Sequence, residues 1–68
     1  MNKNMLRSVM VLHDDTNITL AEYLGISDST LSLKMNETNG AEFTQGEIKK
    51  IIKRYDLTAE QTLQIFFN

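Results

Sequence analysis

A single glycine between two short helical patterns constrains this chain more than any other feature. Apolar residues recur at the spacing of one buried helical face on either side of it: Leu20, Ala21 and Leu24 before, Leu31 and Met35 after. Gly25 ends the first pattern where the chain needs a residue that accepts positive φ without steric cost. Residues 16–36 therefore predict a helix-turn-helix, in which two short helices cross steeply over a tight turn.

The first helix of this motif has two candidate caps, Thr16 and Thr19. Thr19 precedes Glu22 by three residues, which is the spacing of a capping box and the better local match. A start at Thr19 leaves barely more than one turn before the glycine, whereas the motif needs about two turns to brace its second helix. We therefore expect Thr16 to cap the first helix and Ser27 to cap the second.

Two further helices are predicted before and after the motif. The apolar spacing between Met5 and Leu12 indicates a helix over residues 3–12. Residues 36–43 have no helical period and contain the turn dipeptide Asn39-Gly40, so they are expected to form a loop. Thr44 and Glu47 then stand at capping-box spacing, with Phe43 and Ile48 placed as a hydrophobic staple, and predict that a helix begins there.

A last helix is predicted to start at Thr58, with Gln61 three residues later. Its apolar stripe is expected to comprise Ala59, Leu63, Phe66 and Phe67. Ile65 falls off that stripe, and residues 65–67 are together more apolar than a thin core buries. We therefore predict a homodimer contact through Ile65 and Phe67.

Composition excludes several classes of function. The 68 residues are 41% hydrophobic, which suits one small helical domain over residues 1–68 but not a deep enclosed active site. With no cysteine and one histidine, a thiolate or histidine metal centre is not expected. We predict that the protein is not an enzyme and has no cofactor, metal or small-molecule substrate. No apolar run approaches the roughly 18 residues of a membrane span, so a cytoplasmic location is expected.

Charge is segregated along the chain despite a net charge of −2. Residues 1–12 carry +2, residues 13–43 carry −5, residues 44–54 carry +3 and residues 55–68 carry −2. The outer face of the helix after Thr44 carries four bases: Lys49, Lys50, Lys53 and Arg54. Such a face is either solvated or a stripe that follows a DNA backbone, and the sequence leaves both interpretations open.

The outer face of the second motif helix carries the candidate base-contacting residues: Ser27, Asp28, Ser29, Ser32, Leu33 and Asn36. Serine and asparagine both donate and accept hydrogen bonds, aspartate accepts from cytosine, and leucine can contact a thymine methyl group in the major groove. Ser27 and Asp28 can instead merely cap the helix. The candidate phosphate contacts are Asn17, Lys34, Thr44 and Gln45, with backbone amides at residues 44–46 supplying donors.

Three runs, LAEYLGISDSTLSLKMN, EFTQGEI and LTAEQTLQIFF, carry a family resemblance. They resemble the small phage Cro-type and repressor-type helix-turn-helix proteins, in particular the short Cro proteins with an EFTQ-x-EI helix and a terminal IFF. The resemblance covers about residues 5–67. It implies an all-α, five-helix, lambda-repressor-like domain that binds operator DNA as a dimer, with the second motif helix as recognition helix. Lys34 departs from the pattern, because many relatives bury an apolar residue there.

Two classes of function follow from these patterns. The first is a sequence-specific transcriptional regulator, a phage or prophage Cro-like repressor that binds a palindromic operator in double-stranded DNA. The second is a helix-turn-helix reused for protein–protein binding, as in an antirepressor or adaptor. The motif and the family pattern favour the first class, whereas the net acidity, together with Asp28 and Glu37 near the expected groove, is the argument for the second.

Overall fold

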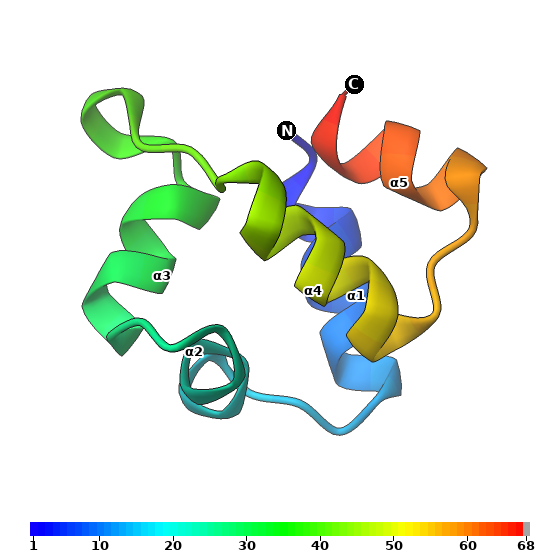
Figure 1. The fold of residues 1–68 in the computed structure, drawn as a ribbon, viewed down its shortest axis with the longest axis horizontal. Coiled ribbons are helices and arrows are strands. Elements are labelled where there is room, and N and C mark those ends of the chain that lie inside the picture. The colour runs from blue at the N-terminus through cyan, green and yellow to red at the C-terminus, as the bar shows by residue number, and fades with distance from the viewer. Residues whose placement is uncertain (68) are drawn as a thin grey trace.

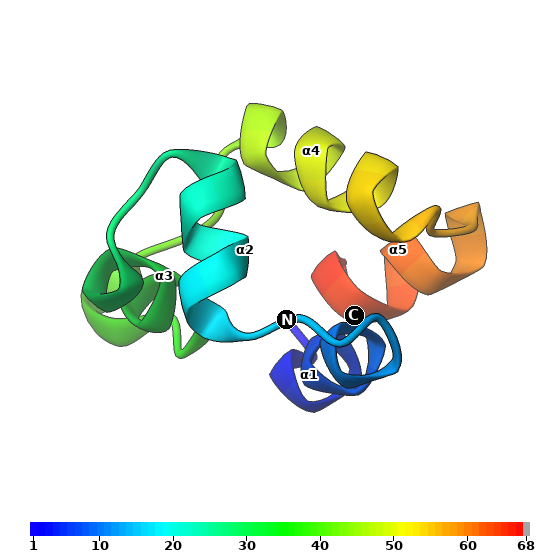
Figure 2. The ribbon, with the colours of Figure 1, turned by 90° about the horizontal axis from the view of Figure 1, so that it is seen from below.

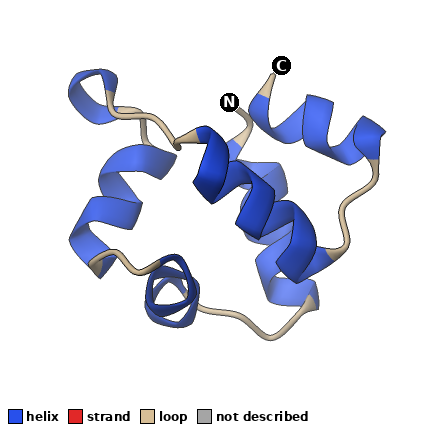
Figure 3. Ribbon diagram, viewed as in Figure 1, coloured by secondary structure: helices blue, strands red, loops and turns tan. Residues whose placement is uncertain are grey.

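A computed structural model describes residues 1–67 and, within that range, contains helices and loops but no strand (Figures 1 and 3). The described elements are α1 (Lys3–Leu12), α2 (Asn17–Leu24), α3 (Asp28–Met35), the 3₁₀ turn η1 (Thr38–Gly40), α4 (Gln45–Tyr55) and α5 (Ala59–Phe66). The prediction of an all-α chain with five α-helices is confirmed for these residues. None of the described helices is long and apolar enough to cross a lipid bilayer.

The helices surround a single apolar centre. In Figure 1, α4 crosses in front of α1, with α2 and α3 on one side of this pair and α5 on the other. Figure 2 shows α4 and α1 on opposite sides of the centre, and α2 and α3 again at the end away from α5. The N-terminal residues lie beside α5, where the backbone N–H of Asn2 donates to the carbonyl of Ile65 at 2.7 Å.

Local capping signals fix the starts of α2 and α3 as predicted. Thr16 caps α2 by accepting from the backbone N–H of Thr19 at 3.2 Å, and the Thr19 hydroxyl accepts from the N–H of Thr16 at 2.9 Å. Both candidate threonines therefore take part, with Thr16 as the cap. Ser27 caps α3 by accepting from the N–H of Thr30. Between the helices, Gly25 has φ 75° and ψ 28°, the left-handed conformation expected for it.

The caps of α4 and α5 are also confirmed. In α4 the Thr44 N–H donates to Glu47 Oε1 at 2.8 Å, and the Glu47 N–H donates to the Thr44 hydroxyl at 3.1 Å. Thr58 and Gln61 form the same reciprocal pair at the start of α5. These boxes satisfy N–H groups that the first turn of a helix leaves without partners.

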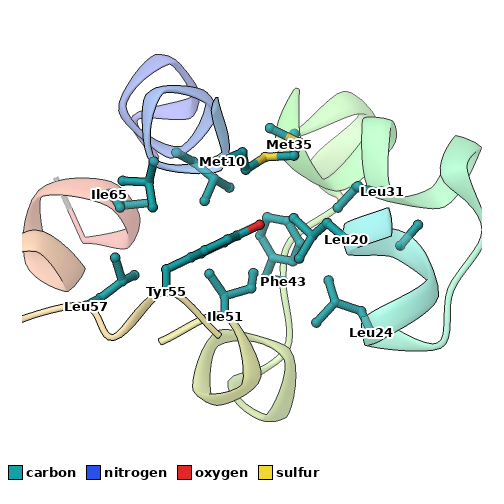
Figure 4. Close-up of a cluster of buried hydrophobic side chains, with 13 residues drawn as sticks. Met10, Leu20, Leu24, Leu31, Met35, Phe43, Ile51, Tyr55, Leu57 and Ile65 are labelled. Atoms are coloured by element: carbon teal, nitrogen blue, oxygen red, sulfur yellow. The ribbon is translucent and has the colours of Figure 1, made fainter. Parts of the chain in front are cut away.

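The core is formed by side chains from all five helices and the loops between them (Figure 4). Its buried members are Leu6, Val9, Met10, Leu20, Ala21, Leu24, Leu31, Met35, Phe43, Ile51, Tyr55, Leu57 and Ile65. Tyr55 of α4 extends across the middle of this cluster (Figure 4). Ala21, whose exposed fraction is 2%, is the small residue on the inner side of α2.

The face of α5 that enters the core agrees with the prediction only at Phe66, which is partly buried and packs against the core. Ile65 is completely buried, whereas Leu63 and Phe67 have exposed fractions of 59% and 66%. An eight-residue helix with this many apolar side chains has two plausible inner faces, and tertiary packing selects between them. Leu57 and the bond between Asn2 and Ile65 anchor the face that carries Ile65. The prediction that Ile65 lies off the core stripe and is free to form a dimer contact is therefore wrong.

A carboxylate before α2 joins α2 to α4. Asp15 accepts two hydrogen bonds from the Arg54 guanidinium, one from Nε at 2.7 Å and one from Nη2 at 3.0 Å. It also accepts hydrogen bonds from the hydroxyls of Tyr55 and Thr19. The Arg54 guanidinium also lies over the Tyr23 ring, 4.6 Å from its centroid. This bidentate, cation–π arrangement fixes the orientation of Arg54, and α2 is thereby held against the C-terminal half of α4.

The Asp15 side chain is only 4% exposed, so its charge depends on these partners. The hydrogen bonds from Arg54 hold the pKa of Asp15 far below its usual range, against the opposing effect of burial. When the pKa of a carboxylate is lower in the folded chain than in the unfolded chain, its ionisation stabilises the fold. The whole of that stabilisation is present at pH values above the unfolded-state pKa of about 4. That stabilisation is lost as the pH falls through the folded pKa.

We expect Asp15→Asn to lower the free energy of unfolding by about 2–3 kcal/mol at pH 7, because it leaves the Arg54 charge without a partner. This estimate is below that for a fully buried pair because the Arg54 side chain is 29% exposed and keeps some water contact. Urea unfolding measures the difference, which should shrink as the pH falls below about 4. The control is Asp14→Asn, an exposed neighbour at φ 55°, where about 0.5 kcal/mol or less is expected. Equal stability of Asp15→Asn and the parent at pH 7 would contradict the proposed role.

Candidate nucleic-acid interface

The outer face of α3 carries small polar groups at an exposed surface. Leu31 and Met35 point inward and are buried, while the six predicted base-contacting residues are exposed or, for Ser32, half-buried. Leu33 has an exposed fraction of 47% and is the one large apolar residue on this face. The face therefore offers short hydrogen-bonding side chains around a single apolar contact.

Two of the six predicted residues already have partners within the chain. The Ser27 hydroxyl accepts from the Thr30 N–H at 3.1 Å and lies 2.8 Å from the Thr30 hydroxyl, so it serves as a helix cap. The Asn36 amide donates to the Ser32 carbonyl at 3.0 Å and accepts from Lys3 at 2.8 Å. The other four, Asp28, Ser29, Ser32 and Leu33, form no side-chain hydrogen bond with residues 1–67 and remain available to a ligand.

Lys34 is not the free cation that the sequence predicted. Its ammonium group donates to both carboxylate oxygens of Glu47, at 2.6 and 2.8 Å, and the two side chains are only 17% and 12% exposed. A phosphate would have to displace this half-buried carboxylate before it met the lysine. Lys34 is therefore a link between α3 and the first turn of α4, and its predicted role as a phosphate contact is not supported by the geometry.

Glu47 serves both α3 and α4 with one carboxylate. It accepts the Thr44 N–H as part of the capping box and both hydrogen bonds from Lys34. Burial raises the pKa of Glu47, but the bonds from Lys34 and Thr44 more than offset it, so the pKa lies below its ordinary value. Glu47 consequently remains ionised and paired at neutral pH.

The surface around α3 is otherwise acidic. Glu22, Asp28 and Glu42 are exposed, and Glu37 pairs with the Met1 ammonium at 2.9 Å. The bases that form no ion pair with a described carboxylate lie on α1 and α4: Lys3, Arg7, Lys49, Lys50 and Lys53. Any attraction of the α3 face for phosphate must therefore come from neighbouring helices.

The four bases of α4 do not share one role. Arg54 is committed to Asp15, which excludes it from a free basic stripe. Lys50 stands three residues after Glu47 and four before Arg54, a spacing that places these side chains along one side of the helix. Because Glu47 contacts α3 and Arg54 lies over Tyr23 of α2, Lys50 is on the side of α4 that is turned toward this helix pair. Lys49 lies about 200° around the helix from Glu47.

The remaining predicted phosphate contacts lie at the starts of helices. Asn17 is the first residue of α2 and is half-buried. Gln45 is the first residue of α4 and is exposed, and Thr44 before it is the cap. Because the Thr44 hydroxyl is used within its capping box, the groups left for an anion at this end of α4 are the Gln45 amide and first-turn backbone N–H groups.

A pocket of about 370 Å³ lies between the end of α5 and the start of α4. Its apolar walls are formed by Phe43, Ile48, Phe66 and Phe67. Phe43 and Phe66 meet edge to face with ring centroids 6.0 Å apart, and Phe67 is the exposed member. The predicted dimer residue Phe67 thus stands at the rim of a pocket that also has charged walls, formed by Lys34, Glu37 and Glu42.

Sequence patterns missed the contacts that join distant segments. Asp15 and Arg54 are 39 residues apart, and Lys3 and Asn36 are 33 apart, so no local spacing relates them. The capping box did identify Glu47, but gave no sign that the same carboxylate holds Lys34.

No protein-family model, curated protein sequence or solved structure matches the chain.

A double-mutant cycle tests the link between α3 and α4. Lys34→Met and Glu47→Gln each remove one partner, and glutamine keeps the ability to complete the capping box. We expect a coupling energy of about 1–2 kcal/mol from urea unfolding, because the pair is half-buried and doubly hydrogen-bonded. Lys49→Met, which removes a lysine with no ion pair to a described carboxylate, should show no coupling to Glu47→Gln. Additive effects of Lys34→Met and Glu47→Gln would argue against the link.

Proposed function

We propose that this chain is a sequence-specific DNA-binding transcriptional regulator of the lambda-repressor-like, helix-turn-helix kind. The observation that carries the proposal is the pair of short helices α2 and α3, joined through left-handed Gly25, with an exposed outer face on α3. A helix presented in this way fits the major groove of B-DNA. The resemblance to small phage Cro and repressor proteins supports the same class, and a cytoplasmic location in a bacterial host follows from it.

Base recognition is assigned to the side chains of α3 that have no partner among residues 1–67. Ser29 and Ser32 would donate to or accept from base edges, and Asp28 would accept from a cytosine amino group. Leu33 would contact a thymine methyl group. Ser27 and Asn36 are engaged in capping and interhelical bonds, so we assign them supporting roles.

Phosphate contacts are assigned to Asn17 and Gln45, at the first turns of α2 and α4. Both positions combine a side-chain amide with backbone N–H groups and the positive end of a helix dipole. Contacts of this kind orient a protein on the duplex without reading sequence. They also need no lysine, which is consistent with a chain whose net charge is −2.

A protein-binding role is the second candidate, and the acidity around α3 favours it. Glu22, Asp28 and Glu42 are exposed, and the one base of α3 is neutralised by Glu47. Such a face would attract a basic protein and repel DNA at long range. Electrophoretic mobility shift at low and moderate salt, with random and prophage-derived duplexes, separates this antirepressor or adaptor role from the first.

Selection of binding sites from random duplex DNA tests the proposed reading face. The parent should enrich one sequence, and Leu33→Ala and Ser32→Ala should each change the preferred base at one position, because each contact contributes about 1–3 kcal/mol of discrimination. Lys53→Gln serves as a control that leaves the ranking of sites unchanged. If the parent enriches no sequence even at low salt, the protein-binding role is favoured. An unchanged preference in both α3 variants would reject this face.

We further propose that the chain acts as a homodimer through α5. Leu63 and Phe67 stand four residues apart and are exposed, so Leu63 takes the place in the contact that the sequence predicted for the buried Ile65. A two-fold axis beside Phe67 would place each Phe67 against the aromatic walls, Phe43 and Phe66, of the other copy's pocket. Two joined recognition helices would give useful affinity where one small module binds weakly.

Sedimentation equilibrium tests the dimer. Leu63→Glu combined with Phe67→Glu should give a folded monomer with greatly reduced binding to a palindrome whose half-site centres are about 34 Å apart. Ile65→Glu is the matched control and should unfold the chain instead, because its side chain is completely buried. A parent that is monomeric at tens of micromolar, and that binds single half-sites as tightly as palindromes, would contradict the dimer.

A further inference from the structure

We propose that Lys3 of α1, held by Asn36, is the cation that contacts a DNA phosphate at the C-terminal end of α3. The inference rests on the proposed DNA-binding function and extends it, because it assigns a phosphate-binding site to a helix outside the helix-turn-helix. It also replaces Lys34, which the sequence favoured for this role. The ligand class is a phosphodiester of the DNA backbone.

The geometry brings Lys3 to α3 from far away in the sequence. The Lys3 ammonium donates to Asn36 Oδ1 at 2.8 Å, across 33 residues of chain. The Asn36 amide nitrogen donates to the Ser32 carbonyl at 3.0 Å, which directs the amide oxygen toward Lys3. Asn36 therefore holds the lysine head at the end of the proposed reading face, beside residues that would enter the groove.

The charge of Lys3 remains uncompensated in this arrangement. Its hydrogen-bond acceptor is a neutral amide, and it forms no ion pair with a carboxylate among residues 1–67. The nearby acid Glu37 is paired with the Met1 ammonium at 2.9 Å. By contrast, the Lys34 ammonium donates to both carboxylate oxygens of Glu47, so its charge is already compensated. Of Lys3 and Lys34, only Lys3 can gain a counter-charge without first losing one.

The ammonium group also has hydrogen-bonding capacity to spare. A lysine has three N–H donors, of which Asn36 uses one, so two remain for the oxygens of a phosphate. A role restricted to the negative end of the α3 dipole would use the same location, but would have no effect on the salt dependence of DNA binding. The number of counterions released on binding therefore distinguishes the two roles.

The test compares Lys3→Gln with the parent by fluorescence anisotropy on one selected duplex between 50 and 200 mM salt. Removal of one phosphate contact should reduce the slope of log K against log salt by about one. The parent should therefore lose about threefold to fourfold more affinity than Lys3→Gln across this range. The loss at low salt should be equal for specific and random duplexes, and Lys3→Arg should restore the parent slope.

Two lysine variants serve as controls. Lys49→Gln removes the same charge from the side of α4 turned away from α3, and Lys34→Gln removes the lysine that is paired with Glu47. Both should keep the parent's slope of log K against log salt. Thermal unfolding of each variant confirms that the fold is retained. If Lys3→Gln keeps the parent's slope of log K against log salt, or if Lys3→Gln and Lys49→Gln reduce this slope equally, the assignment of Lys3 is overturned. Either result would leave the proposed DNA binding intact. Absence of any salt-dependent binding by the parent would instead overturn the proposed function.

Discussion

The structure depends on the Asp15 carboxylate more than on any other polar group. One nearly buried side chain accepts hydrogen bonds from Arg54, Tyr55 and Thr19, and so joins the segment before α2 to the last turn of α4. Arg54 extends the same contact to the Tyr23 ring on α2. Because Tyr55 is also central in the apolar core, loss of this carboxylate would disturb both the packing and the placement of α2.

A second carboxylate performs the matching task at the other end of α4. Glu47 completes the cap of α4 and holds Lys34 of α3, so the position of α3 depends on the same residue that starts α4. The segment before α2 and helix α3 are thus each joined to α4 by an ion pair, one near each end of α4. In the proposed DNA complex these two contacts would fix the angle at which α3 meets the groove, because a shift of α3 or of the segment before α2 would break a partly buried ion pair.

Local signals predicted the parts of the fold that depend on neighbouring residues. Thr16, Gly25 and Thr44 marked helix ends correctly because caps and left-handed turns are settled within about four residues. The inner face of α5 was predicted wrongly, since the choice between Ile65 and Leu63 is made by packing against α1 and Leu57. The prediction that Lys34 contacts a phosphate lacks support for the same reason. Its partner, Glu47, is set by tertiary structure, which residue type and spacing do not reveal.

The scarcity of free cations near α3 bears on how a regulator of the proposed kind would find its site in a genome. Non-specific DNA binding is driven almost entirely by release of counterions, and a chain of net charge −2 whose α3 face is acidic would release few of them. Chromosomal DNA, with its millions of competing positions, would then retain only a small fraction of the molecules. The free concentration would follow the rate of synthesis closely, so a gene switch under its control would respond to small changes in copy number.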